Sequence, residues 1–176
     1  MPAFATVDGS LDGLMKSMAA RPEGHAVFTE SQFLALLKTR LDSSGELNFR
    51  APDHLEKLTR KPFAESLVID SGTLTVTRGS QHHAVALASY PQLAAFIDCI
   101  RATLAGDRAA LERTFTLQFA ADGTRWSLSL TPRDAKLASL VRQIRIEGAG
   151  DAIGTVETLR ADGDRSVMTI TPVPGT

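Results

Sequence analysis

The sequence is poor in the features that mark several classes of protein. It contains one cysteine, Cys99, in 176 residues, so no disulfide can form within the chain. No run approaches the roughly 20 consecutive apolar residues that a membrane-spanning helix needs. An excess of charge is absent too, since 19 basic residues balance 20 acidic ones to a net charge of -1. A protein that binds nucleic acid through a broad basic surface is therefore not expected.

Residue patterns that support catalysis or metal binding are also scarce. His82 and His83 are neighbours on a predicted strand, so their side chains point to opposite faces and cannot share a metal ion. No Cys and His cluster has the spacing of a zinc site, and no Gly-x-Ser-x-Gly turn of a hydrolase occurs. Gly148 and Gly150 lack the third glycine of a dinucleotide-binding fingerprint. We predict no catalytic residue, no metal site and no cofactor, with an acyl-handling enzyme as a weaker alternative.

Two helices are predicted from apolar residues that recur every three or four positions. The first covers residues 10–20 and has Leu11, Leu14, Met15 and Met18 on one face, as either a cover for a sheet or a lid. The second begins at Pro91, ends at Gly106 and carries the apolar stripe Leu93, Phe96, Ile97, Ile100 and Leu104. Cys99 lies among these apolar neighbours and is expected to be a small buried residue rather than a reactive thiol.

Most of the remaining chain alternates apolar and polar residues with period two, as β-strands do. A long strand is predicted over residues 26–37, followed by a turn at Ser43-Ser44-Gly45. Further short turns at 70–72, 78–80 and 122–123 join neighbouring strands and require antiparallel pairing. Nine or ten strands are expected in a single sheet or barrel. A sheet of that length curls strongly, and only the helices can cover its concave face.

Three segments in the first half of the chain form an ordered set of motifs. They are Phe28-Thr29-Glu30, the turn-and-proline segment at 48–55, and the hairpin at 65–74. A proline-led helix follows, and then a strand pair joined by Asp-Gly that ends in Trp126-Ser127-Leu128-Ser129-Leu130-Thr131-Pro132. Over about residues 24–172 the chain resembles the periplasmic outer-membrane lipoprotein carriers, the LolA-like family, and within that family a divergent branch.

The resemblance implies a single domain over residues 1–176 of the α+β class. Its strongly curved antiparallel sheet would form an incomplete β-barrel, with helices covering the concave face. The implied function is that of a non-enzymatic periplasmic carrier or chaperone, which binds lipid or the acyl chains of a lipoprotein in a helix-lidded hydrophobic groove. The implied partners are lipid or acylated protein cargo, and membrane-associated donor and acceptor proteins. Residues 1–5 lack the start of a signal peptide, and the resemblance favours a periplasmic protein whose signal peptide is absent from this sequence.

The groove is expected to be lined by apolar side chains that gain free energy when they cover an acyl chain. From the strands these are Phe49, Leu74, Val76, Phe115, Leu117, Phe119, Trp126, Leu128 and Leu130, and from the second helix Leu93, Phe96, Ile97 and Ile100. The alternative is that the same residues pack on one another as a filled core. The protein would then be a structural or adaptor module that binds a protein partner at a sheet edge.

One position departs from the pattern of the family. Classical carriers have an arginine directly before the proline, proposed to latch the lid, whereas Ala51 precedes the proline here. Arg50 points to the opposite face by the two-residue period, and Arg60 is close only along the chain. The resemblance therefore does not by itself imply a latch of the classical type.

Overall fold

The computed structural model describes residues 10–51 and 53–173, apart from the side chains of residues 91–93, 95 and 96. The described residues form eleven strands, four α-helices and one 3-10 helix. In chain order these are α1 (Leu11–Ala19), β1 (Glu23–Leu34), β2 (Thr39–Arg50), β3 (His54–Lys61), β4 (Glu65–Asp70), β5 (Thr73–Arg78), β6 (Gln81–Ala86), η1 (Leu87–Ser89), α2 (Pro91–Ala105), α3 (Arg108–Thr114), β7 (Phe115–Asp122), β8 (Arg125–Pro132), α4 (Ala135–Ala138), β9 (Val141–Ala149), β10 (Ala152–Arg160) and β11 (Arg165–Pro172).

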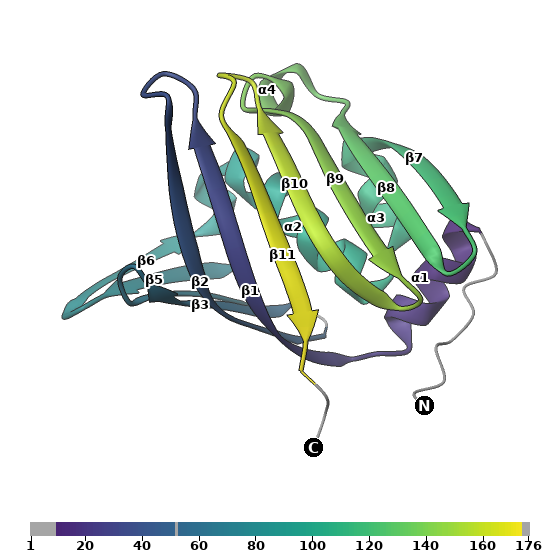
Figure 1. Ribbon diagram of the computed structural model, residues 1–176, viewed down its shortest axis with the longest axis horizontal. Helices are drawn as coiled ribbons and strands as arrows, with labels where there is room; N and C mark the ends of the chain where they lie inside the picture. The colour runs from purple at the N-terminus through teal and green to yellow at the C-terminus, as the bar shows by residue number, and fades with distance from the viewer. Residues whose placement is uncertain (1–9, 52, 174–176) are drawn as a thin grey trace.

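All eleven strands pair into one antiparallel sheet, in the order β6-β5-β4-β3-β2-β1-β11-β10-β9-β8-β7. The first and last strands lie side by side in the middle of the sheet, because β1 pairs with β2 on one side and with β11 on the other. The sheet curves strongly and the helices lie behind it in the view of Figure 1. Strands β6 and β7 do not meet, so the barrel stays incomplete. The predicted α+β class with an open, helix-covered antiparallel sheet is confirmed.

Local sequence signals begin and end several of these elements as expected. The Ser10 hydroxyl accepts a hydrogen bond of 3.0 Å from the Gly13 amide and caps α1. Helix α2 begins at Pro91 and ends before Gly106, whose φ of 70° is left-handed. The β4–β5 turn has Ser71 and Gly72 at positive φ, as a two-residue hairpin loop requires.

The turn predicted at residues 43–45 is wrong, because those residues lie inside β2. The chain turns at residues 35–38 instead, and β1 pairs with β2 without interruption from Glu23 opposite Arg50 to Leu34 opposite Thr39. Gly45 serves a bulge between β2 and β3, where β3 carries an extra residue. A Cβ at Gly45 would lie 1.9 Å from the Leu58 carbonyl oxygen, so close backbone approach requires the glycine here.

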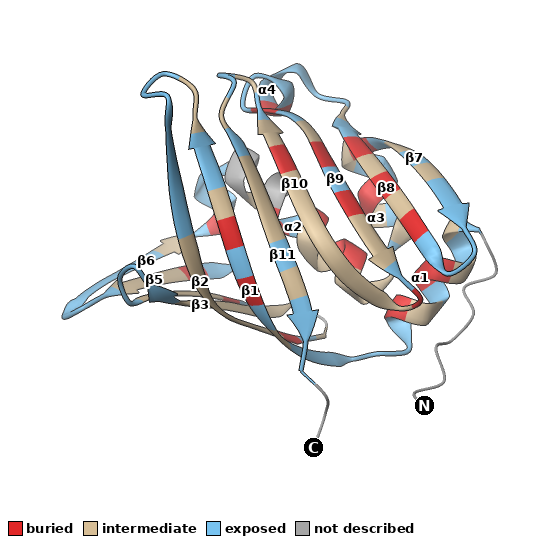
Figure 2. Ribbon diagram, viewed as in Figure 1, coloured by how far each residue is buried: buried red, intermediate tan, exposed pale blue. Residues whose placement is uncertain are grey.

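Buried side chains form two separate clusters. Figure 2 shows the buried residues in red along the strands and helices. The first cluster joins α1 to β7–β9 and contains Leu14, Met15, Met18, Cys99, Ala102, Leu111, Phe115, Trp126, Leu128, Leu130, Leu137, Val141, Ile144 and Ile146. The second cluster contains Ile69, Leu74, Leu87 and Ile97. Helix α2 contributes to both, since Ile97 belongs to the second cluster and Cys99 to the first. It therefore ties the two halves of the sheet together.

Cys99 is a buried core residue, as expected from its apolar neighbours. Its side chain is 2% exposed, and burial raises the pKa of its thiol to about 12. A thiol in this environment stays protonated and unreactive at neutral pH.

Candidate functional site

Between the two clusters lies a part of the inner face that belongs to neither. We call it the central strip, and define it as Phe28 and Glu30 on β1, Leu47 and Phe49 on β2, Lys57 on β3, and Met168 and Ile170 on β11. Leu47, Met168 and Ile170 are only half-buried. The strip therefore keeps apolar surface that the protein itself covers incompletely.

Strand register shows that the strip faces the same side as both clusters. Phe49 lies opposite Leu55, and Leu55 lies opposite Ile69 of the second cluster. On the other side, Met168 lies opposite Val156, which in turn lies opposite Ile146 of the first cluster. Residues opposite one another on paired strands share a face. The strip is thus the floor of the concave side, midway between two packed cores.

Helix α2 bridges the region above this floor. It reaches from Ile97 in the second cluster to Ala102 in the first, and it lies behind β10 and β11 in Figure 1. Ile100 and Leu104 on this helix are half-buried and belong to neither cluster. Incompletely buried apolar residues are therefore present on both the floor and the bridging helix.

One ion pair lies among these apolar residues. The Lys57 ammonium donates to a Glu30 carboxylate oxygen at 3.0 Å, and its nitrogen lies 5.2 Å from the centroid of the Phe28 ring. The side chain of Glu30 is only 10% exposed. Strand β2 runs between the two partners, and Gly45 there lies opposite Phe28. Because Gly45 has no side chain, the lysine can cross β2 and stack its charge over the aromatic ring.

Comparison with known proteins assigns this architecture. The family model described as outer membrane lipoprotein carrier protein LolA-like matches residues 3–171. The chain belongs to this LolA-like family. No curated protein matches it.

The solved structures that match this LolA-like chain are distant from it in sequence. A DUF1329 family protein from Desulfovibrio piger ATCC 29098 gives a TM-score of 0.54 at 10% identity, with 92% of this chain and 88% of that chain covered. A LolA superfamily protein from Nitrosomonas europaea gives 0.46 at 10% identity, with 95% and 94% covered. LprF from Mycobacterium bovis gives 0.41 at 15% identity, with 96% of each chain covered. At 10% identity the likeness to the Desulfovibrio piger protein concerns the fold alone.

The predicted groove residues of this LolA-like protein are divided among the regions described above. Buried in the first cluster are Phe115, Trp126, Leu128 and Leu130, with Leu117 and Phe119 packed against it. Leu74 and Ile97 belong to the second cluster, and Val76 packs against that cluster. Phe49 lies in the central strip, and Ile100 is half-buried on α2. The side chains of Leu93 and Phe96 lie outside the described residues. As a groove lining, the whole set stays a prediction.

The sequence analysis overlooked the charged pair and most of the central strip. A signal was present for Lys57, because the two-residue period assigns it to the same strand face as Leu55. The arginines considered for a latch lie elsewhere. Arg50 is exposed, and Arg60 pairs with Glu46 at 3.0 Å on the outer face. Lys57 is therefore the cation that faces the concave side on these strands.

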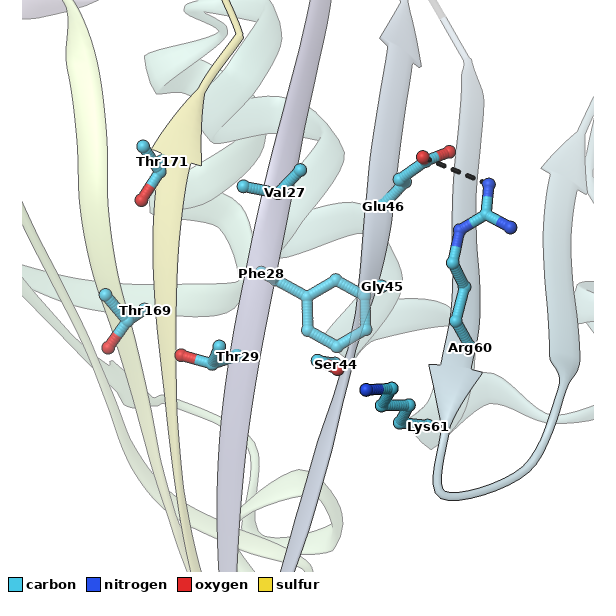
Figure 3. A pocket seen from close by; sticks show the side chains of 10 residues that line it. All are labelled: Val27, Phe28, Thr29, Ser44, Gly45, Glu46, Arg60, Lys61, Thr169 and Thr171. Atoms are coloured by element: carbon cyan, nitrogen blue, oxygen red, sulfur yellow. Dashed lines mark hydrogen bonds and ion pairs between the residues drawn. The ribbon is translucent and has the colours of Figure 1, made fainter.

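An open groove of about 370 Å³ lies on the outer face, opposite the strip (Figure 3). It is lined by Val27, Phe28, Thr29, Ser44, Gly45, Glu46, Arg60, Lys61, Thr169 and Thr171. The lining combines apolar surface with hydroxyl groups and the Glu46–Arg60 ion pair, and the groove is open to solvent, so it does not enclose an apolar chain. Within the described residues no three His, Cys, Asp or Glu side chains gather to hold a metal ion.

The described helices are too short or too polar to cross a membrane.

Proposed function

We propose that this LolA-like protein is a non-enzymatic periplasmic carrier that holds lipid, or the acyl chains of a lipoprotein, against the central strip. The supporting observation is that apolar residues on the strip and on α2 belong to neither core cluster, although α2 spans the gap between the clusters. Cargo would cover the apolar side chains that the protein itself leaves half-buried. The periplasmic location rests on the family, and codons for a signal peptide upstream of this sequence would test it.

The energetics favour such cargo. Each buried methylene contributes about 0.8 kcal/mol, so a sixteen-carbon chain gains on the order of 10 kcal/mol before the cost of ordering it. The two clusters pack on different halves of the sheet, and α2 is the helix common to both. A small shift of α2 against one half would widen the space above the strip while the other core stays packed. The proposal therefore includes a groove that opens for loading and closes afterwards.

A fluorescent fatty acid tests the proposal directly. Ile170 faces the strip and its neighbour Thr169 faces the outer groove, so the two residues form a matched pair on one strand. We expect Ile170→Gln to weaken binding of the probe by about tenfold or more, because a polar amide replaces apolar lining. Thr169→Gln should bind as the wild type does. Equal binding by both variants, or no binding by the wild-type protein, would contradict the proposal.

The adaptor module remains the second candidate, and a specific observation favours it. Phe115, Leu128 and Leu130, predicted to line a groove, are almost completely buried in the first cluster. Strands β6 and β7 also each leave one edge unpaired in the described sheet, and an extended partner could add a strand there. Native mass spectrometry separates the candidates. Co-purifying acyl species support the carrier, whereas lipid-free protein that also fails to bind the probe supports the adaptor.

A further inference from the structure

The hairpin formed by β1 and β2 ends in an exposed apolar tip. Its turn, residues 35–38, contains Leu36, which is 92% exposed, and Leu37, which is 68% exposed. Phe33 and Leu41 on the adjoining strand ends are also exposed, on opposite faces of the hairpin, because Phe33 lies opposite Arg40 and Leu41 lies opposite Gln32. Single exposed leucines are common, but two adjacent leucines exposed to this extent at the end of a hairpin suit an interaction surface.

The tip is held in position rather than loosely attached. The two strands pair in register up to Leu34 opposite Thr39, directly before the turn. The Ala35 amide then donates to an Asp164 carboxylate oxygen at 3.0 Å in the neighbouring β10–β11 turn. Figure 1 shows both turns at the same end of the sheet, and Figure 2 shows this tip as exposed. The fold therefore presents the leucines outward from a braced hairpin.

Basic residues accompany the leucines. Lys38, in the same turn at a φ of 47°, is exposed and makes no ion pair within the described residues. Arg40 follows it and pairs with Asp42 at 3.0 Å. Exposed leucines beside a free cation match the two parts of an anionic lipid surface, since apolar side chains enter the acyl boundary while lysine approaches phosphate. A protruding tip also suits a deformable bilayer better than a flat protein surface.

We propose that the tip, Leu36-Leu37-Lys38, inserts into the surface of a bilayer that contains anionic phospholipid. Strand β1 carries both Phe28 and Glu30 of the central strip and leads directly into this tip. Docking would bring the strip close to the membrane by way of one continuous strand. The inference concerns where the protein docks and holds whether or not the strip binds cargo.

Vesicle flotation of the full chain tests this inference. We expect the wild-type protein to float with phosphatidylcholine vesicles that contain phosphatidylglycerol, less so at high salt. The double variant Leu36→Ser/Leu37→Ser should bind these vesicles about tenfold or more weakly, because it removes two apolar side chains from the interface. Lys38→Glu should weaken binding to the anionic vesicles only. The matched control is Val173→Ser, an exposed apolar position that follows β11 at the opposite end from the braced turn.

A fluorophore reports insertion independently of the loss-of-binding variants. An NBD group attached through Thr39→Cys lies beside the turn, while the buried native Cys99 stays unlabelled. Its emission should shift to the blue when anionic vesicles are added. No flotation of the wild-type protein, or equal flotation of the double serine variant, would overturn the proposal. So would a wild-type dimer in sedimentation experiments that the double serine variant abolishes, because the tip would then bind a second copy.

Discussion

Gly45 is required at its position because glycine has no Cβ atom. A Cβ there would come within 1.9 Å of a β3 carbonyl oxygen, and backbone atoms cannot move aside as a flexible side chain can. We predict that Gly45→Ala lowers the free energy of unfolding by roughly 2 to 3 kcal/mol, as overpacking does. Urea denaturation measures this. Gly24→Ala is the control, because nothing lies within 4 Å of its added Cβ, and equal stability of the two variants would refute the assignment.

A second prediction at the residue scale concerns the ion pair between Glu30 and Lys57 in the central strip. Lys57→Met keeps the length of the side chain but leaves the nearly buried Glu30 carboxylate without its cation. We expect a loss of about 1 to 3 kcal/mol of unfolding free energy, and recovery of most of it when Glu30→Gln is added. Urea denaturation of the single and double variants measures the coupling. The exposed Lys61→Met serves as control, and additive effects would rule out the pairing.

His54 on β3 predicts a dependence of stability on pH. Hydrogen bonds to the Glu56 and Asp70 carboxylates raise the pKa of His54 above 6.5, and the bond to His54 lowers the pKa of Asp70 below 3.8. The folded protein therefore holds the imidazole proton more tightly than the unfolded chain does. The contribution of His54 is full below pH 6.5 and is lost as pH rises through the raised pKa; that of Asp70 is full above pH 3.8 and is lost on acidification through the lowered pKa.

The comparison that tests this is thermal unfolding of the wild type and His54→Gln across this pH range, with NMR titration of the imidazole. The stability advantage of the wild type should shrink as pH rises above neutrality. An imidazole that titrates below pH 6.5, or identical pH profiles, would contradict the assignment.

At the scale of the elements, the packing of α1 distinguishes a fixed cover of the sheet from a loosely held lid. Leu14 is 0% exposed, and a Cβ at Gly106, which ends α2, would lie 2.1 Å from the Met15 carbonyl oxygen. The two helices therefore pack closely, and α1 is part of the first cluster. We predict that Leu14→Ala costs about 2 to 5 kcal/mol of unfolding free energy, whereas the exposed Lys16→Ala on the same helix costs little. A loosely held lid would instead lose little stability on either change.

Local sequence patterns were sufficient to locate the two longer helices. Periodicity of 3.6 residues located α1 and α2, and Pro91 and Gly106 mark the ends of α2 because each has a conformational preference of its own. The turn of the β1–β2 hairpin, in contrast, was predicted at the wrong residues. Ser43, Ser44 and Gly45 have the composition of a turn. Gly45 is instead required because the paired strand β3 approaches its backbone closely. Local composition does not distinguish a tight turn from a close approach.

At the scale of the whole molecule, cargo in the central strip would bridge the two clusters. A ligand that binds only the folded form stabilises it by about 2.7 kcal/mol at a hundredfold excess over Kd. We predict that a fatty acid at this concentration raises Tm of the wild type more than that of Ile170→Gln, because tenfold weaker binding removes about 1.4 kcal/mol of the stabilisation. Trp126 lies in the first cluster, with its indole N–H donating to the Gly150 carbonyl at 2.9 Å, so its emission should change little. Thermal unfolding followed by circular dichroism measures the shift, and an unchanged wild-type Tm would argue against a bound cargo.

The sequence by itself determined the two longer helices and the antiparallel pairing of strands joined by short turns, because periodicity, caps and short turns are local properties of the chain. It did not determine where the first hairpin turns or that β1 pairs with β11. Only the tertiary structure decided how the apolar residues are shared. Phe115, Leu128 and Leu130 alternate as cleanly as any groove lining would, yet helices pack on them and bury them. Leu47, Met168 and Ile170 have no stronger pattern, and remain half-buried because they lie between two cores. Burial depends on what lies opposite a side chain, and only the paired sheet and its covering helices decide that.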